Sequence, residues 1–376
     1  MTINTATVCR HYRTGELLSL EAGDNGFTLR APVAAAETDL FLAPALVDMQ
    51  INGYKNISFT SDSLTPEAVK FVFDEMAAVG VPYFCPTVTT DAPETMLHGL
   101  RIVEEACARW PELAKANAGY HLEGPWIASE DGPRGAHPRE WTRDPSWEEF
   151  QRLQQAAGGK IKIVSLAPER DGAIPFIKRL AAAGIVAALA HCGPTPEQVT
   201  AAADAGARMS THLGNGAHAM LPRHPNYLWE QLADDRLHIS IIPDGFHLPP
   251  SVVKVMVRAK GVQRTVLVSD IFLLSGLQPG IYRLDDNRSA EVAANGRIGL
   301  HGTPFLAGAN TTVDQCVGNT VAYAGVDLAD AIDMASVNAW RLLDVAPPAI
   351  TPGADAAGLM LYRWREGKLE IVQTIR

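Results

Sequence analysis

The sequence predicts an α/β protein built around a (β/α)8 TIM-like barrel. Eight short apolar runs lie between residues 41 and 270, and helical patterns separate most of them. Strands that alternate with helices form a parallel sheet, and eight parallel strands are enough to close a barrel. The alternative is an open doubly wound sheet, but no GxGxxG segment follows an early strand to support it. The runs span residues 41–50, 81–90, 119–124, 161–168, 184–191, 207–212, 237–243 and 264–270.

Two of the predicted helices have clear start signals. Thr65-Pro66-Glu67 offers a hydroxyl cap, a proline at the first helical position and an acid in the first turn. We expect that helix to run to about Gly80. Thr195-Pro196-Glu197 repeats the pattern and opens an alanine-rich helix that ends near Gly206.

The alternation of strands and helices is interrupted after the eighth run. Residues 271–300 contain several glycines and a proline, followed by a short polar segment that looks like a hairpin. A helix from about residue 311 and another over 328–343 then complete the barrel.

Both ends of the chain show short strand-like patterns instead of helical ones. We expect residues 1–43 and 349–376 to form a small β-sandwich domain together. Residues 44–348 then form the (β/α)8 barrel, which is the part expected to carry the chemistry.

Composition excludes several classes of partner and location. The chain has 376 residues and a formal net charge of −10, which argues against nucleic acid or an anionic membrane as a partner. Its five cysteines are scattered and form no CxxC pair, a pattern typical of a reducing compartment. We see neither a signal peptide nor an apolar stretch of membrane-spanning length. The expected location is the cytoplasm.

Four polar residues stand at the ends of apolar runs, where barrel enzymes keep their active sites. They are Glu123, His191, His212 and Asp270. One carboxylate and two imidazoles suit a single Zn2+-like ion with open positions for water, and the fourth residue is then free to accept a proton. For each histidine alone, a buried core residue with its own hydrogen bonds is an equally good interpretation. Three imidazole or carboxylate groups at three strand ends favour the metal site.

Six motifs between about residues 41 and 360 link the chain to a known family. They are Val47-Asp48-Met49-Gln50-Ile51-Asn52-Gly53, His121-Leu122-Glu123-Gly124-Pro125-Trp126, Ala190-His191, Thr211-His212-Leu213-Gly214-Asn215, Pro243-Asp244-Gly245-Phe246-His247 and Thr303-Pro304-Phe305-Leu306-Ala307-Gly308. In this order they resemble the N-acetylglucosamine-6-phosphate deacetylases of the amidohydrolase superfamily. The motif around Glu123 is the most specific of the set.

This resemblance implies metal-dependent hydrolysis of the acetamide of an N-acetylated amino-sugar 6-phosphate, which gives acetate and the amino-sugar phosphate. By the same resemblance Asp270 is the general base and then the acid, and His137 contacts the sugar or the amide carbonyl. His247 contacts the substrate, while Asn215 and the amide of Gly216 hold the phosphate.

The resemblance also implies a homodimer. Arg223 lies where the family contributes an arginine to the phosphate of the neighbouring subunit, and a guanidinium can bind two phosphate oxygens at once. A solvated loop cation is the alternative for this residue. His218 and His224, on the same segment, are either phosphate contacts or surface residues, and we favour the second.

A single divalent ion per subunit is expected, not a pair. Where the superfamily often has two histidines on the first strand, this chain has Gln50 and Asn52, and amides are poor ligands for a transition metal. Zn2+ is the first choice at Glu123, His191 and His212, with Fe2+, Mn2+ and Co2+ as alternatives.

Two other functions stay open. One is the same chemistry on another acylated amine or amino sugar, galacto-configured or unphosphorylated. The other is a non-catalytic barrel that binds a sugar, which the intact set of Glu123, His191, His212 and Asp270 argues against.

Overall fold

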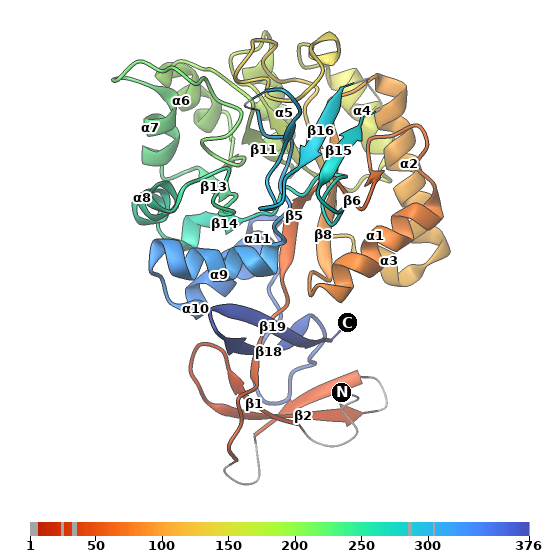
Figure 1. The fold of residues 1–376 in the computed structure, drawn as a ribbon, viewed down its shortest axis with the longest axis vertical. Coiled ribbons are helices and arrows are strands. Elements are labelled where there is room, and N and C mark those ends of the chain that lie inside the picture. The colour runs from red at the N-terminus through yellow and green to blue at the C-terminus, as the bar shows by residue number, and fades with distance from the viewer. Residues whose placement is uncertain (1–6, 24–25, 32–35, 285–287, 304, 376) are drawn as a thin grey trace.

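Eight parallel strands form the central sheet of the computed structural model, which describes residues 7–23, 26–31, 36–284, 288–303 and 305–375. The strands follow one another in chain order around the sheet, and helices surround them (Figure 1). The predicted TIM-like barrel is therefore confirmed. The strands are β5 (Val47–Ile51), β8 (Tyr83–Thr89), β9 (Tyr120–Glu123), β10 (Ile161–Leu166), β11 (Val186–Leu189), β12 (Met209–Ser210), β13 (His238–Ile241) and β14 (Thr265–Leu267).

The helices begin where the capping signals predict. Thr65 accepts a hydrogen bond from the backbone of Ala68, and Thr195 forms a reciprocal capping box with Gln198. The predicted single helix over 328–343 is divided in two at Ser336. The helices are α1 (Pro66–Ala78), α2 (Pro93–Arg109), α3 (Pro111–Ala116), α4 (Trp147–Ala156), α5 (Ala173–Ala182), α6 (Pro196–Asp204), α7 (Tyr227–Ala233), α8 (Pro250–Lys260), α9 (Val313–Ala324), α10 (Leu328–Met334) and α11 (Val337–Leu342).

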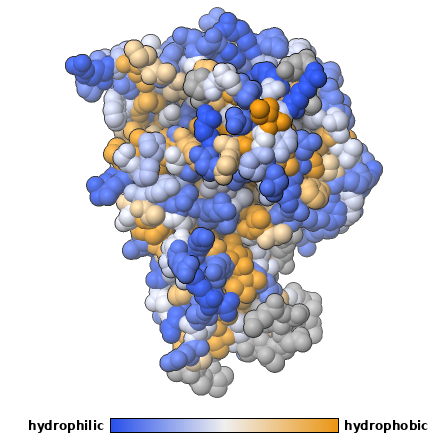
Figure 2. Space-filling view, in the orientation of Figure 1, coloured by the Kyte–Doolittle hydropathy of each residue, from blue (hydrophilic) through white to orange (hydrophobic). Residues whose placement is uncertain are grey.

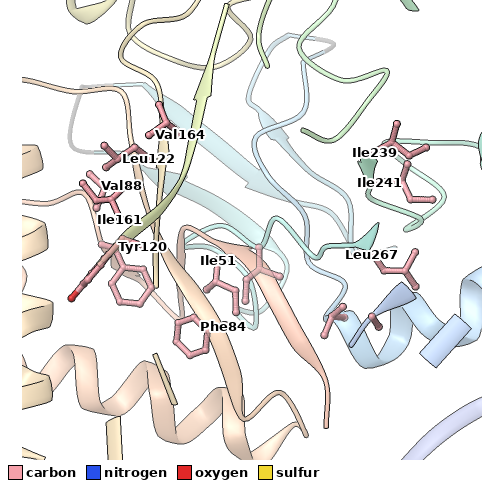
Figure 3. Close-up of a cluster of buried hydrophobic side chains, with 14 of the residues drawn as sticks. Ile51, Phe84, Val88, Tyr120, Leu122, Ile161, Val164, Ile239, Ile241 and Leu267 are labelled. Carbon is pink, nitrogen blue, oxygen red and sulfur yellow. The ribbon is translucent and has the colours of Figure 1, made fainter. Parts of the chain in front are cut away.

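The barrel strands are buried on both faces. Alternate residues of a strand point to opposite faces, so each strand contributes to two clusters. The larger cluster joins the strands to the surrounding helices, and Figure 3 shows Leu122 and Ile241 among its members. The second joins Met49, Ile163 and Met209, from strands far apart in the sequence, and fills the barrel interior. The strand ends are thus held rigidly, which fixes the side chains that follow them.

The two chain ends form one six-stranded sheet at the base of the barrel (Figure 1). Its order is β19-β18-β4-β1-β2-β3, and every pair except β1 with β4 is antiparallel. The prediction of one strand over 41–50 is wrong, because the run divides at Ala45 into a strand of this sheet and the first barrel strand. The proposed domain boundaries stay a prediction. The strands are β1 (Thr7–His11), β2 (Leu17–Gly23), β3 (Gly26–Arg30), β4 (Phe41–Pro44), β18 (Leu359–Arg365) and β19 (Lys368–Thr374).

The segment after the eighth barrel strand forms a small antiparallel sheet above the barrel mouth (Figure 1). Its strands are β15 (Gly280–Arg283), β16 (Ser289–Val292) and β17 (Ile298–Leu300), one more than the hairpin expected. Arg288 joins this sheet to the loop after β9, because its Nη1 donates to the carbonyl of Ala136 at 2.8 Å.

The hydrophilic surface and the free cysteines agree with the charge and the cysteine pattern of the sequence. The face shown in Figure 2 is mainly hydrophilic, with smaller apolar patches between charged side chains. None of the described helices combines the length and the apolar character that a membrane crossing requires. All five cysteines are buried and free.

Candidate metal and catalytic site

Three of the predicted site residues meet at the C-terminal end of the barrel. Glu123 is the last residue of β9, while His191 and His212 each follow the end of their strand by two residues. One donor atom from each lies within 4.8 Å of the others, and all three residues are buried. Glu123 Oε1 is 3.2 Å from His191 Nε2 and 2.8 Å from His212 Nε2.

The backbone at the site is strained in a way that ends the strands abruptly. His191, His212 and Asp270 have φ angles of 45°, 30° and 53°, in the left-handed region. Such a conformation costs a non-glycine residue roughly 1–2 kcal/mol and persists only where the surroundings enforce it. At His212, for example, the backbone N–H donates to Ser240 Oγ at 2.7 Å. The left-handed conformation turns the chain at the barrel mouth, at the predicted site residues themselves.

The donor set fits a cation. His191 Nδ1 lies 2.9 Å from the carbonyl oxygen of Pro133, so this nitrogen carries the proton and leaves the Nε2 lone pair facing Glu123. Two acceptors that face each other repel unless a positive charge lies between them. Burial raises the pKa of Glu123, but its contacts with His191 and His212 outweigh burial and hold the pKa well below the usual range. An ionised carboxylate beside a neutral imidazole is the ligand chemistry of a divalent metal.

His137 joins the cluster from the loop after β9. Its Nε2 is 3.1 Å from His191 Nε2, and its carbonyl accepts from Arg134 Nη1 at 2.6 Å. Burial, and then the charge of His191, lower the pKa of His137 to about 3. A neutral imidazole beside the ligand set can donate or accept a hydrogen bond with a bound molecule.

Asp270 is held by two amide side chains, one in the first barrel strand and one directly after it. Gln50 Nε2 donates to Asp270 Oδ1 at 3.0 Å and to Glu123 Oε1 at 2.9 Å, and Asn52 Nδ2 donates to Asp270 Oδ1 at 2.6 Å. Burial, and then the charge of Glu123, raise the pKa of Asp270 to about 6. The sequence excluded these amides as metal ligands but did not predict this bridge. The alternation Gln50-x-Asn52 at the end of one strand was the available signal, since both side chains then point to one face.

His247 is oriented by Asp244, a partner that the sequence analysis did not assign. His247 Nδ1 lies 2.7 Å from Asp244 Oδ2, and the backbone N–H of His247 donates to Asp244 Oδ1 at 2.7 Å. Burial raises and the bond to His247 lowers the pKa of Asp244, with a net result below its ordinary value. An aspartate three residues before a histidine, next to a glycine, is the sequence signal for such a turn.

Of the predicted phosphate-binding residues, two lie beside the cluster and one does not. A Cβ atom on Gly216 would lie 2.5 Å from His191 Nδ1, so its backbone packs directly on that imidazole. The neighbouring Asn215 has a buried Nδ2 without a partner among the described residues. Arg223 is exposed further along the loop and, in the part of the chain that the structure describes, forms no ion pair.

The remaining histidines divide into structural and surface residues. His121 is buried, with Nδ1 3.0 Å from the carbonyl of Met49 and Nε2 2.7 Å from Ser165 Oγ, which agrees with a structural role. His224 is exposed, as expected. His218 is not a plain surface residue, because its Nδ1 is 3.0 Å from Tyr227 Oη and its Nε2 is 3.2 Å from Glu130 Oε2.

Comparison with known proteins identifies the family. No family model matches the chain. It is 31% identical over 348 residues to the N-acetylgalactosamine-6-phosphate deacetylase of Escherichia coli O157:H7, with 90% of each chain covered. It is 31% identical over 383 residues to the human N-acetylglucosamine-6-phosphate deacetylase, covering 94% of this chain and 90% of the human one. The chain belongs to the N-acetylglucosamine-6-phosphate deacetylase family.

Solved structures agree with this assignment. A mutant N-acetyl-D-glucosamine-6-phosphate deacetylase from Mycobacterium smegmatis, in complex with N-acetyl-D-glucosamine-6-phosphate, has a TM-score of 0.83 and 28% identity over 99% of this chain and 100% of that one. The deacetylase from Thermotoga maritima has the same fold, with a TM-score of 0.82 at 23% identity over 98% and 99% of the two chains. The chain is therefore a metal-dependent hydrolase of the amidohydrolase superfamily.

Proposed function

We propose that this protein removes the acetyl group from an N-acetylated amino-sugar 6-phosphate, with N-acetylglucosamine 6-phosphate as the first candidate. The observation that supports this most directly is the convergence of Glu123, His191 and His212 beside Asp270. A metal-ligand set and a separate carboxylate that can move a proton are what metal-assisted hydrolysis of an amide by water uses. The products are acetate and the amino-sugar phosphate.

Glu123, His191 and His212 are the proposed ligands of one divalent ion, for which Zn2+ is the first choice. When bound, such an ion lowers the pKa of a water molecule and polarises the acyl carbonyl. The three residues contribute by their geometry: Pro133 fixes the tautomer of His191, and burial keeps competing water away from Glu123.

Asp270 is the proposed general base and acid. Its carboxylate takes a proton from the attacking water and delivers it to the nitrogen of the departing amine. Gln50 and Asn52 both donate to the same oxygen, Oδ1, which leaves Oδ2 for proton transfer. His137, neutral at physiological pH, is proposed to donate a hydrogen bond to the acyl oxygen as negative charge develops there.

The sugar phosphate is proposed to bind across the loop after β12. The unpartnered Asn215 Nδ2 and the backbone N–H of Gly216 supply neutral donors, and His247 contacts the sugar. Arg223, exposed and without an ion pair among the described residues, supplies the charge to the neighbouring subunit of a homodimer. A cytoplasmic location stays a prediction, in agreement with five free cysteines.

A galacto-configured substrate is the second candidate, favoured by the similarity to the N-acetylgalactosamine-6-phosphate deacetylase of Escherichia coli O157:H7. An acetate-release assay with metal-reconstituted protein tests both. The panel contains N-acetylglucosamine and N-acetylgalactosamine, each with and without 6-phosphate. We expect release from a 6-phosphate and at least tenfold less from the matching free sugar, because the phosphate contributes charge-assisted hydrogen bonds. Equal rates on both forms would contradict the proposed substrate class.

A further inference from the structure

The barrel has a seam between β5 and β14, which are the two ends of the strand order. Every other pair of neighbouring barrel strands is joined by a backbone ladder in the described residues. Across the seam, beyond the end of β14, the backbone N–H of Asp270 donates to the carbonyl of Gln50 at 3.1 Å and that of Asn52 donates to the carbonyl of Ile271 at 3.0 Å, which makes an isolated parallel bridge. At the base, Val47 bonds instead to Ala335, whose carbonyl accepts at 2.9 Å. A step without a regular ladder separates the bond at the base from those at the mouth.

The carboxylate of Asp48 fills that step. It accepts from the backbone N–H of Gln50 at 3.1 Å and from that of Ser269 at 3.2 Å and 3.3 Å. Ser269 Oγ in turn donates to the carbonyl of Gln50 at 3.4 Å. Below the backbone bonds at Asp270 and Ile271, a side chain thus joins the first barrel strand to the residue before Asp270.

Burial of the Asp48 carboxylate at the seam is energetically unfavourable. Asp48 is 1% exposed, and within the described residues it forms no ion pair. The thiols of Cys85 and Cys316, which lie near it, are neutral. Burying an acid without a cation is unfavourable, so a seam that needed only closure could be built more cheaply from neutral groups.

What the carboxylate adds is a fixed position for two residues of the mouth. Its partners are Gln50, whose side chain bridges Glu123 and Asp270, and Ser269, which precedes Asp270 in the chain. Asp270 has a strained backbone with φ of 53°, which must be held by its surroundings.

We propose that Asp48 is a positioning residue for the deacetylation: it fixes the main chain at Gln50 and Ser269, and through them the carboxylate of Asp270. The inference rests on the proposed function, because it assigns to Asp48 a role in the reaction of Asp270. A displacement of about 1 Å at a reacting group can lower a rate by about a hundredfold. Correct alignment of the Asp270 carboxylate can therefore offset the unfavourable burial of Asp48.

The test is Asp48→Asn, which keeps the shape but presents an N–H donor to one of the two backbone N–H groups. We expect kcat to fall about tenfold or more, KM to change by less than about twofold, and the metal content to stay that of the wild type. Ser336→Ala is the matched control at the other end of the seam, where Ser336 Oγ donates to the carbonyl of Ala45 at 2.7 Å. It should lower thermal stability and leave kcat unchanged.

A double variant separates positioning from general damage. If Asp48 acts through Asp270, Asp48→Asn has no further effect on the residual rate of Asp270→Asn. Should Asp48→Asn fail to fold, Ser269→Ala replaces it. That variant removes the bond from Ser269 Oγ to the carbonyl of Gln50, which holds the same main chain. There kcat should fall about threefold with KM unchanged.

Two results overturn the inference. One is a kcat of Asp48→Asn within about twofold of the wild type, or, where that variant does not fold, an unchanged kcat of Ser269→Ala. The other is an equal fall with and without Asp270. Wild-type protein that releases no acetate from any acetamido sugar would instead refute the proposed function, and this inference with it.

Discussion

The proposed metal side and the proposed phosphate side of the mouth are held in different ways. Glu123, His191 and His212 are buried at strand ends, and each is fixed by hydrogen bonds to its neighbours. The loop after β12 is exposed at residues 219–220 and 222–225, and its far end is anchored where Asn226 caps α7. Arg223 lies on this exposed part. The proposed chemistry is thus held by the barrel, whereas the proposed phosphate recognition depends on an exposed loop.

Loss of the metal side should have the largest effect. Glu123→Gln removes the charged ligand, so we expect acetate release to fall below detection and bound metal to be lost. The measurements are acetate release and metal content by elemental analysis. Glu104→Gln in α2 is the control, because the Glu104 carboxylate accepts a hydrogen bond at 2.6 Å from Oη of Tyr120, the first residue of β9. Metal retained in Glu123→Gln would contradict the proposed ligand set.

Asp270→Asn should separate acid–base chemistry from metal binding. The amide cannot accept a proton, so we expect kcat to fall by about 10²–10⁴. Metal content should stay that of the wild type, since Asp270 is not among the proposed ligands. A variant that keeps at least a tenth of the wild-type kcat would show that another group moves the proton.

Much of this arrangement could be predicted from the sequence, because the carboxyl ends of barrel strands converge on one mouth. Glu123, His191 and His212 follow apolar runs, so their meeting needed only the fold. The left-handed backbone at His191 could not be predicted, since nothing local to a histidine specifies a positive φ. The division of the run 41–50 was also hidden, because both of its halves are apolar and buried.

The amide bridge shows a different limit. The sequence indicates only that Gln50 is a poor metal ligand. In the structure, its amide donates hydrogen bonds to two carboxylates. Its function depends on distances between Glu123 and Asp270, residues far apart in the chain, and spacing alone does not give such distances.

Arg223→Ala tests whether the exposed side requires a partner. We expect KM for the sugar phosphate to rise about tenfold to a hundredfold, with kcat little changed, because a charge-assisted hydrogen bond is lost. His224→Ala, at the next exposed position, is the control and should leave KM unchanged.

A mixing experiment shows from which subunit the arginine comes. Equal amounts of Arg223→Ala and Glu123→Gln protein, exchanged to form mixed dimers, contain one complete site in each mixed dimer. We expect about a quarter of the wild-type activity at low substrate concentration. Activity no greater than that of the separate variants would show that Arg223 does not act across a dimer.

Gly216→Ala tests whether a change on the proposed phosphate side affects the proposed metal side. The new Cβ would lie 2.5 Å from His191 Nδ1, at a residue with φ of 59°, so the imidazole has to shift. We expect metal affinity to fall about tenfold, as for the loss of an outer partner of a ligand. Gly184→Ala is the matched control, with φ of 72° and no atom within 4 Å of the added Cβ. It should cost stability of about 1 kcal/mol without an effect on the metal. Equal metal affinity in both variants would refute the contact.

The last prediction concerns stability: the free energy of unfolding should depend on pH through Asp48, the residue that joins the two sides of the seam. Burial raises the pKa of Asp48 from 3.8 to about 7. The folded chain therefore binds this proton more tightly than the unfolded chain does. The stabilisation is complete below about pH 4 and is lost as the pH rises through about 7. Asp48→Asn has no such proton, so the stability advantage of the wild type should shrink between pH 4.5 and pH 7.5, by about 3 kcal/mol. Urea unfolding of the wild type and of Asp48→Asn, both treated with a chelator to remove metal, measures this difference at the two pH values. A stability advantage that grows with pH would mean that the backbone N–H groups keep Asp48 ionised throughout.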